Sequence, residues 1–299
     1  MKNFLNRLVT GLTLAILIVW GVLWCKWVFL LVTLLAMGGT MLEFARITED
    51  HIAHDGRFAK RYKSLLLFIS SFLLILSFFL NQRYSLADIG YFFPIGIVFF
   101  FVIELYAKSE KPFENIGRNI LALVYILLPF LILNKLYFEK GKLVVLATVF
   151  ISWYFDSFCY IFGSLIGRKK LMERISPKKT IEGFLGGAAM VLILVYFYPT
   201  ILEWIAKAIP EYAVWSAPYN STQWLFLGIL AIGASTFGDL VESMFKRSIG
   251  IKDSGNVLPG HGGLLDRIDA LLIFIPVMAL GFWILDQWNS ILLILSFLG

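Results

Sequence analysis

Charged residues are scarce in this chain, and their scarcity decides its class. Only 15% of the 299 residues are Asp, Glu, Lys or Arg, whereas 59% are apolar. Soluble domains contain about 25% charged residues and roughly 45–50% apolar ones. A water-soluble globule of this length could not hide 28 Phe, 9 Trp and 12 Tyr. The composition excludes a soluble globular domain, a disordered chain, a collagen and a coiled coil, and it predicts a multi-spanning membrane protein.

Cysteine and the common soluble-enzyme motifs are almost absent as well. Cys25 and Cys159 are far apart and form no Cys-x-x-Cys pair, so neither a disulfide framework nor a zinc site is predicted. The sequence holds no Ser/His/Asp triad spacing and no Walker-type loop. The net charge of +6 does not indicate nucleic acid, because cytoplasmic loops of membrane proteins collect Lys and Arg. We therefore expect no nucleic-acid partner.

Apolar segments predict the fold, since a membrane-spanning helix needs about 20 predominantly apolar residues. Nine segments qualify: 8–24, 27–45, 64–80, 90–106, 119–134, 143–165, 184–204, 224–245 and 268–285. They predict an all-α, polytopic transmembrane helix bundle that forms one membrane domain over residues 1–299. No cleavage site follows the first segment, so we expect it to be retained. A last apolar stretch at 291–298 is too short to cross, follows a polar break at 286–290, and is expected to lie at the interface or to pack on the bundle.

The basic residues predict the orientation. If the N-terminus is cytoplasmic, 20 of the 26 Lys and Arg residues fall on the cytoplasmic side and 6 on the other. This asymmetry is what the positive-inside rule expects. We therefore predict a cytoplasmic N-terminus and cytoplasmic loops at 46–63, 107–118, 166–183 and 246–267.

Acidic residues inside predicted spans are costly in lipid and are functional candidates. Asp156, Asp239 and Asp269 each fall near the predicted cytoplasmic end of a span. Glu43 and Glu104 also lie in apolar segments, but near their ends. For these two residues we expect a structural or solvent-exposed role.

The richest polar stretch runs from residue 243 to residue 269. Its glycines near His261 permit positive φ values and close approach to a ligand, and successive backbone N–H groups in such a loop bind anions. Four basic side chains suited to phosphate oxygens lie in the same stretch: Lys246, Arg247, Lys252 and Arg267.

Two carboxylates end this stretch. Asp266 and Asp269 are three residues apart and share one face of a helix. Carboxylate pairs of this kind suit Mg²⁺, which takes few protein ligands besides waters and substrate phosphates. Asp239 is a candidate third ligand from the preceding span.

A second basic loop, at 166–183, faces the same predicted side. Lys178 and Lys179 are candidate phosphate contacts, with Asp156 close by at the end of the preceding span. Ser176 followed by Pro177 predicts the N-cap and first residue of a helix.

Residues 243–269 resemble the signature of the phosphatidate cytidylyltransferases, also called CDP-diacylglycerol synthases. The fixed positions of that pattern are met by Ser243, Lys246, Arg247, Lys252, Asp253, Gly255, Pro259, His261, Gly262, Gly263, Asp266, Arg267 and Asp269. Asp156, Ser157, Gly163, Gly167 and residues 176–183 are also similar to the family. The resemblance thus covers the last four predicted spans (143–285), whereas the first five (8–134) match only in being apolar.

The resemblance implies transfer of CMP from CTP to phosphatidic acid, giving CDP-diacylglycerol and pyrophosphate, with one or two Mg²⁺ ions held by Asp239, Asp266 and Asp269. It implies phosphate contacts from Lys246, Arg247, Lys252, Arg267, Lys178, Lys179, Gly262 and Gly263. His261 either positions a phosphate or protonates the leaving group. The implied partners are CTP, phosphatidic acid, membrane lipids and a second copy of the chain. The implied place is the cell membrane, with the site toward the cytoplasm.

Three alternatives remain open from the sequence. Two are related enzymes, an isoprenoid-lipid cytidylyltransferase and a CTP-using lipid kinase, because the lipid pocket is generic apolar helix surface. The third is an ion-coupled transporter, in which the intramembrane acids would bind ions or protons.

Overall fold

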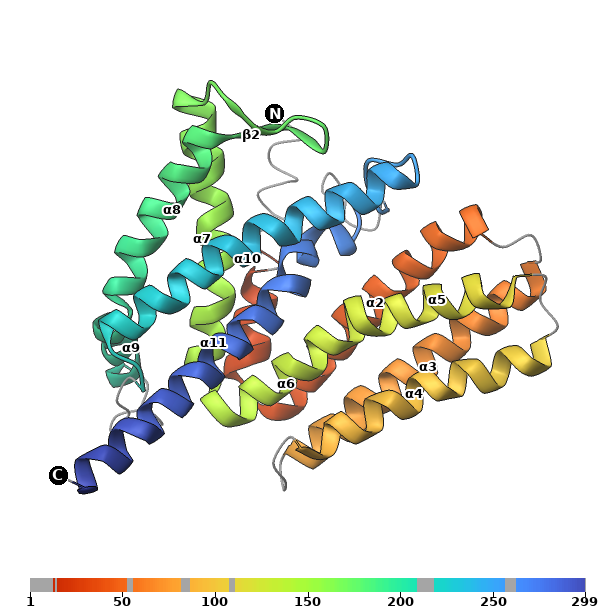
Figure 1. Cartoon of the computed structure of the whole chain (residues 1–299), viewed down its shortest axis with the longest axis horizontal. Helices are drawn as coiled ribbons and strands as arrows, with labels where there is room; N and C mark the ends of the chain where they lie inside the picture. The colour runs from red at the N-terminus through yellow and green to blue at the C-terminus, as the bar shows by residue number, and fades with distance from the viewer. Residues whose placement is uncertain are drawn as a thin grey trace. The chain divides into compact units, whose positions relative to one another are not determined.

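The computed structural model describes residues 13, 15–52, 56–81, 87–107, 111–208, 218–255 and 262–298. Almost all of this part of the chain is helical (Figure 1), which confirms the predicted all-α, polytopic class. The elements are α2 (Lys26–Ile52), α3 (Gly56–Asn81), α4 (Ala87–Ala107), α5 (Pro112–Ala122), η1 (Leu123–Leu127), α6 (Leu128–Lys140), α7 (Lys142–Ile166), β1 (Lys170–Met172), β2 (Ser176–Thr180), α8 (Ile181–Tyr196), α9 (Tyr198–Lys207), α10 (Ser221–Ser248) and α11 (Leu265–Leu298).

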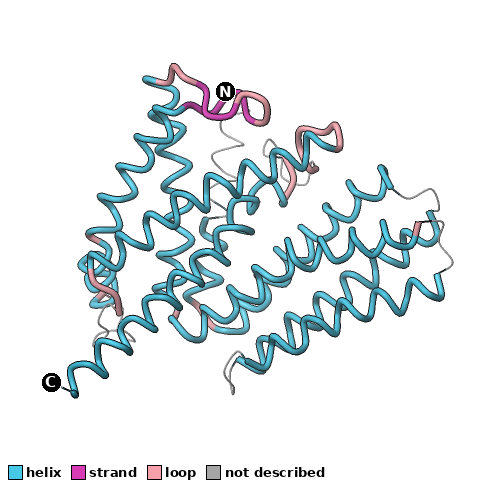
Figure 2. The backbone as a smooth tube through the Cα atoms, viewed as in Figure 1, coloured by secondary structure: helices cyan, strands magenta, loops and turns pink. Residues whose placement is uncertain are grey.

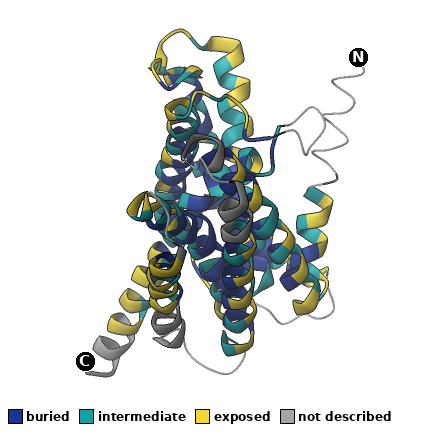
Figure 3. Ribbon diagram, turned by 90° about the vertical axis from the view of Figure 1, so that its right-hand side faces the viewer, coloured by how far each residue is buried: buried dark blue, intermediate teal, exposed yellow. Residues whose placement is uncertain are grey.

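The chain packs as two compact units. Unit 1 consists of Met1–Lys142 and Phe245–Leu272, and unit 2 of Leu143–Met244 and Ile273–Gly299. Within single helices, buried and exposed residues alternate along the chain (Figure 3), as expected of helices that pack on one side only. Each unit therefore combines segments that are distant in the sequence.

The core of unit 1 forms around α2. Met37, Met41 and Phe44 are almost completely buried and recur at the spacing of one helix face. They belong to one apolar cluster with residues of α3 and of the continuous helix α5–η1–α6. Leu265, the first residue of α11, is also fully buried in this cluster. The start of α11 is thus held by the N-terminal part of the chain.

The helix from Pro112 to Lys140 contains one π-helical turn, η1. Pro129 follows this turn directly and lies in the first turn of α6. Proline has no N–H to donate and its ring clashes with the preceding turn of a regular α-helix. A wider turn at this point lets the span continue past the proline.

Unit 2 is held together by aromatic and hydroxyl contacts between its helices. Trp224 of α10 is fully buried and packs edge-on against Tyr198 of α9. The Tyr198 hydroxyl donates to the Ala147 carbonyl at 3.3 Å, and Ser235 donates to Ser152 at 3.2 Å. These contacts join α7, α9 and α10.

Six helices of the described residues are long and apolar enough to cross a membrane, or seven if the pair α8–α9, bent by 53°, counts as one span. They include six of the nine predicted segments, and the bent pair includes a seventh. The segment 90–106 corresponds to a shorter apolar helix at Phe93–Tyr106, and residues 8–12 and 14 of the first segment lie outside the described residues. The count of nine spans stays a prediction.

Two local predictions are wrong. Ser176 and Pro177 do not open a helix: they belong to β2, which pairs with β1 in an antiparallel hairpin (Figure 2). The helix begins five residues after Ser176, at Ile181, because the side chain of Thr180 caps it by accepting from Gly183 N at 3.2 Å. In a two-stranded hairpin both strands are edges, where proline is tolerated.

The predicted polar break at 286–290 is also wrong, since α11 continues through it to Leu298. Its polar side chains find partners within unit 2 and leave the backbone helix intact. The Tyr219 hydroxyl donates to Asp286 Oδ1 at 2.9 Å, and Gln223 Nε2 donates to Asn289 Oδ1 at 2.8 Å. The stretch 291–298 is therefore the end of the last long helix.

Candidate functional site

The loop between α10 and α11, residues 249–264, is the centre of the candidate site in unit 1. α10 ends at Ser248 and is followed by Gly250, where φ is +72°. Gly250 N donates to the Arg247 carbonyl and Ile251 N donates to the Lys246 carbonyl, which is the Schellman pattern that closes a helix. Arg247 strengthens this end, because its Nη1 donates to the Ile251 carbonyl at 3.0 Å.

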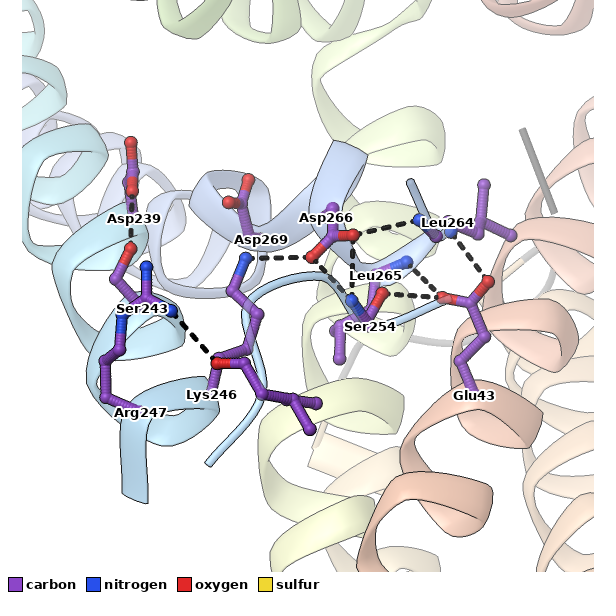
Figure 4. A network of polar contacts seen from close by, with 12 residues as sticks. Glu43, Asp239, Ser243, Lys246, Arg247, Ser254, Leu264, Leu265, Asp266 and Asp269 are labelled. Carbon is purple, nitrogen blue, oxygen red and sulfur yellow. Dashed lines mark hydrogen bonds and ion pairs between the residues drawn. The ribbon is translucent and has the colours of Figure 1, made fainter. Parts of the chain in front are cut away.

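Asp266 connects three points of this loop (Figure 4). Lys246 Nζ donates to Asp266 Oδ1 at 2.8 Å, and the backbone N–H groups of Ser254 and Gly263 donate to Oδ2, each at 2.9 Å. The side chains of Lys246 and Asp266 are only 12% and 7% exposed. A buried ion pair needs such additional hydrogen bonds to offset its desolvation. Asp266 therefore holds the loop in shape and fixes the ammonium of Lys246.

Two of the glycines near His261 lie against side chains of the site, whereas their predicted close approach to a ligand stays a prediction. Gly262 has φ +83°, and a Cβ there would overlap the carboxylate of Asp266. A Cβ at Gly263 would overlap both Ser254 Oγ and Glu43 Oε2. His261 lies outside the described residues, together with residues 256–260.

Glu43 of α2 is a residue of this region that the sequence did not point to. It is 6% exposed, and its carboxylate accepts from three donors of the loop. Leu264 N donates to Oε1 at 2.8 Å, while Leu265 N and Ser254 Oγ donate to Oε2 at 2.8 and 3.0 Å. The sequence analysis expected a structural or solvent-exposed role for Glu43. It did not predict that this side chain contacts the signature.

The remaining polar residues of the signature lie around this centre. Asp269 is partly buried one turn after Asp266, and its Oδ1 accepts from Ala270 N at 2.7 Å. Lys252 and Arg267 have exposed side chains, as does Arg247. These three cations lie on the surface, where a polyanionic ligand can reach them.

Unit 2 brings together three candidates that are far apart in the sequence. Lys179 of β2 forms an ion pair with Asp239 of α10. The Ser243 hydroxyl donates to the other oxygen of Asp239 at 3.3 Å. Asp156 of α7 interacts electrostatically with both Lys179 and Asp239. Lys178, the neighbour of Lys179 in the strand, is exposed.

Close packing of α7 on α8 places this hairpin. A Cβ on Gly183 would lie 2.9 Å from Gly163 Cα and 2.7 Å from the Cys159 carbonyl oxygen. Below the hairpin, the carboxylate of Glu182 accepts from the backbone N–H groups of Arg168 and Lys169 at 2.9 and 3.1 Å. The lysines of β2 are therefore presented from a rigid base.

The carboxylates agree in chemistry with Mg²⁺, which prefers hard oxygen ligands. Asp239 belongs to unit 2, whereas Asp266 and Asp269 belong to unit 1. Among the residues that the structure describes, no group of three or more His, Cys, Asp and Glu side chains forms a metal-binding cluster. The oxygens of Asp266 already accept from an ammonium and two backbone N–H groups. Asp239 accepts from Lys179 and Ser243, which is one donor fewer than Asp266 has, so Asp239 is the more available metal ligand of the two.

Comparison with known proteins gives a consistent result. The sequence model of the cytidylyltransferase family matches residues 5–285. A phosphatidate cytidylyltransferase of Thermotoga maritima is 34% identical over 195 residues, which cover 65% of this chain and 68% of that protein. The phosphatidate cytidylyltransferase of Bacillus subtilis (strain 168) is 34% identical over 216 residues, covering 69% and 74%. For that of Staphylococcus aureus (strain COL) the identity is 34% over 174 residues, 58% of this chain and 61% of that protein.

Proposed function

Because the chain belongs to the cytidylyltransferase family, we propose that it transfers CMP from CTP to phosphatidic acid in phospholipid biosynthesis. An oxygen of the phosphatidate phosphate attacks the α-phosphorus of CTP. The bond from that phosphorus to the bridging oxygen of the β-phosphate breaks, and pyrophosphate leaves with the electron pair. The relatives named as phosphatidate cytidylyltransferases support this choice of substrates.

The single observation that carries the proposal is the network around Asp266. Its carboxylate fixes the Lys246 ammonium beside Gly262 and Gly263, and a fixed ammonium next to glycines is suited to bind a phosphate. The acceptor phosphate is already an anionic nucleophile, so the reaction needs no general base. The site must instead bring two polyanions together and neutralise the charge that grows on the leaving pyrophosphate.

The basic residues divide this task by position. Lys246 and Lys179 are each held by a carboxylate, so each presents its charge at a fixed place. The exposed side chains of Arg247, Lys252 and Arg267 in unit 1, and of Lys178 in unit 2, are further candidate phosphate contacts. His261 positions a phosphate or protonates the leaving group, as the resemblance implies.

Mg²⁺ is the cofactor that we propose for this reaction, as one ion or a pair. Its candidate ligands, as the resemblance implies, are the carboxylates of Asp239, Asp266 and Asp269. Bound Mg²⁺ neutralises phosphate charge and polarises the reacting phosphorus.

We further propose a cell-membrane protein whose site faces the cytoplasm, where CTP is made. The excess of basic residues on that side supports this orientation. Membrane lipids surround the spans, and a homodimer is the proposed assembly. The family membership favours nucleotidyl transfer over an ion-coupled transporter.

The experiment that tests the function uses purified protein, CTP labelled at the α-phosphorus, Mg²⁺ and a panel of lipids. We expect label in CDP-diacylglycerol when phosphatidic acid is present, with release of unlabelled pyrophosphate. Label transferred to an isoprenoid phosphate instead would reassign the acceptor. Transfer from CTP labelled at the γ-phosphorus would identify a lipid kinase.

A further inference from the structure

The buried carboxylate of Glu43 connects α2 with both ends of the loop between α10 and α11. Ser254 lies before residues 256–261 and Leu264 and Leu265 lie after them, yet all three donate to the same side chain. The sequence separation from Glu43 exceeds 200 residues in each contact. One carboxylate thus closes the loop that carries the signature.

The charge of Glu43 suits this position. Leu264 and Leu265 begin α11, and the first N–H groups of a helix have no partner within it. A carboxylate there satisfies these donors and interacts favourably with the positive end of the helix dipole. Burial strengthens both effects, because water does not compete for the donors.

Glu43 and Asp266 hold Ser254 from two directions (Figure 4). The Ser254 hydroxyl donates to Glu43, whereas its backbone N–H donates to Asp266 at 2.9 Å. Asp266 in turn binds Lys246. A displacement of Ser254 on the Glu43 side would therefore disturb the acceptor that fixes the Lys246 ammonium.

The backbone around Glu43 packs closely against the loop. A Cβ on Gly39, one turn earlier in α2, would lie 2.6 Å from the Leu264 side chain. A Cβ on Gly255 would lie 3.1 Å from Glu43 Oε1. Phe44 stacks on Phe245 of α10, with ring centroids 5.3 Å apart. α2 therefore packs so closely against the loop that even one added methyl group at Gly39 would clash with it.

We propose that Glu43 is a positioning residue: by holding Ser254, Leu264 and Leu265, it keeps the signature loop in the form that binds the triphosphate of CTP. The inference rests on the proposed function. It assigns to α2, a helix without any part of the signature, an indirect role in substrate binding, through the loop that Glu43 holds.

The test compares Glu43→Gln, Glu43→Asp and Ser254→Ala in the full-length protein in detergent. Glutamine keeps the size but replaces one acceptor oxygen with a donor that faces the loop N–H groups. Hydrogen bonds to a charged group contribute enough that we expect kcat/KM for CTP to fall about 10- to 100-fold. The KM for CTP should rise more than that for phosphatidic acid, and Glu43→Asp, which keeps the charge, should recover part of the loss. In the double variant, Ser254→Ala should lower kcat/KM for CTP little beyond the loss caused by Glu43→Gln alone.

The matched control is Glu104→Gln. Glu104 is also a buried carboxylate of an apolar helix, 5% exposed, and it accepts from Asn115 Nδ2 of α5 at 3.1 Å. Equal effects of Glu43→Gln and Glu104→Gln on the two KM values would overturn the inference, as would unchanged CTP affinity in Ser254→Ala. If Glu43→Gln lowers the yield of folded protein, Ser254→Ala alone decides.

The same experiment separates failure of the inference from failure of the proposed function. CTP affinity is measured directly, without lipid, on the wild type and on each variant. Wild-type protein that binds CTP but labels a different lipid refutes only the acceptor. Wild-type protein that does not bind CTP refutes the function and the inference together.

Discussion

Two lysines of the candidate site each face one carboxylate, and their environments differ. Lys246 and Asp266 are nearly buried, whereas Lys179 and Asp239 are 28% and 27% exposed. A buried pair resists separation, because removing one partner leaves an uncompensated charge. A half-exposed pair is weaker and exchanges partners readily. We infer that Asp266 shapes the loop, whereas Asp239, whose ion pair with Lys179 is the more exposed of the two, exchanges its partner for a metal cation more readily.

The substitutions Asp266→Asn and Asp239→Asn should therefore differ in their response to Mg²⁺. Asp239→Asn should raise the Mg²⁺ concentration for half-maximal activity by at least about tenfold. Asp266→Asn should lower kcat/KM at every Mg²⁺ concentration and lower the Tm, because breaking a buried pair costs about 3–5 kcal/mol. Mg²⁺ titrations of activity and thermal unfolding in detergent measure both effects. If high Mg²⁺ fully restored the activity of Asp266→Asn, the main role of Asp266 would be to bind the metal ion and not to shape the loop.

Lys179→Ala tests whether the hairpin serves the nucleotide. Losing one charge-assisted contact with the triphosphate should lower kcat/KM for CTP about 10- to 100-fold. Lys170→Ala is the control, since Lys170 is an exposed lysine of the paired strand. Steady-state kinetics with CTP as the varied substrate give the comparison. If Lys179→Ala and Lys170→Ala had equal, small effects on kcat/KM for CTP, the hairpin lysines would serve only to set the membrane topology.

The crossing of α7 and α8 decides where that hairpin lies. The helices approach each other at Gly163 and Gly183 so closely that a methyl group has no room. Gly183→Ala should therefore lower stability by about 1–3 kcal/mol, the usual cost of overpacking. Gly233→Ala in α10, where no atom lies within 4 Å of the new Cβ, should be neutral or slightly stabilising. Thermal unfolding of the two variants, with CTP affinity as a second measurement, checks this; equal Tm values would contradict it.

The sequence predicted the long helices because a long run of apolar residues is a local feature that can be read without knowing the tertiary contacts. It did not predict the hairpin, since Ser176 and Pro177 are typical of a helix start and the competing cap, Thr180, lies four residues later. The pairing of β1 with β2 and the contacts of Glu182 decide between these two starts. Such contacts leave no periodic pattern in the sequence.

Glu43 was undervalued for a related reason. The signature showed which loop carries the polar groups, but no local pattern shows which distant side chain holds that loop. The available signal was an acidic residue within an apolar segment, one turn after a glycine pair, Gly38–Gly39. A carboxylate inside a membrane segment is expected to have a polar partner. The partners of Glu43 are more than 200 residues away in the sequence.

At the scale of the whole molecule, the signature does not belong to one half of the chain. Residues 245–272 pack in unit 1 with the N-terminal 142 residues, whereas Lys179, Asp156 and Asp239 belong to unit 2. The N-terminal spans, which carry no motif, are thus the scaffold of the signature loop. Truncation of these spans is expected to remove the loop's support and not merely membrane anchorage.

The orientation that we propose rests on the distribution of basic residues and is open to a direct test. A background of Cys25→Ser and Cys159→Ser removes both native thiols. Glu173→Cys, in the exposed hairpin, should react with a membrane-impermeant maleimide only after the cells are permeabilised. Asn220→Cys, at the exposed start of α10, should react in intact cells.

The reason for this expectation is that moving basic segments across a membrane is unfavourable, and 20 of the 26 basic residues share the predicted cytoplasmic side. Glu173 lies between Lys170 and Arg174, so its side of the membrane is also that of the hairpin lysines. The thiol-free background, labelled in parallel, gives the baseline. Labelling of Glu173→Cys in intact cells would place the hairpin outside, away from cytoplasmic CTP. The lysines of β2 would then be excluded from the nucleotide site, whatever the effect of Lys179→Ala on activity.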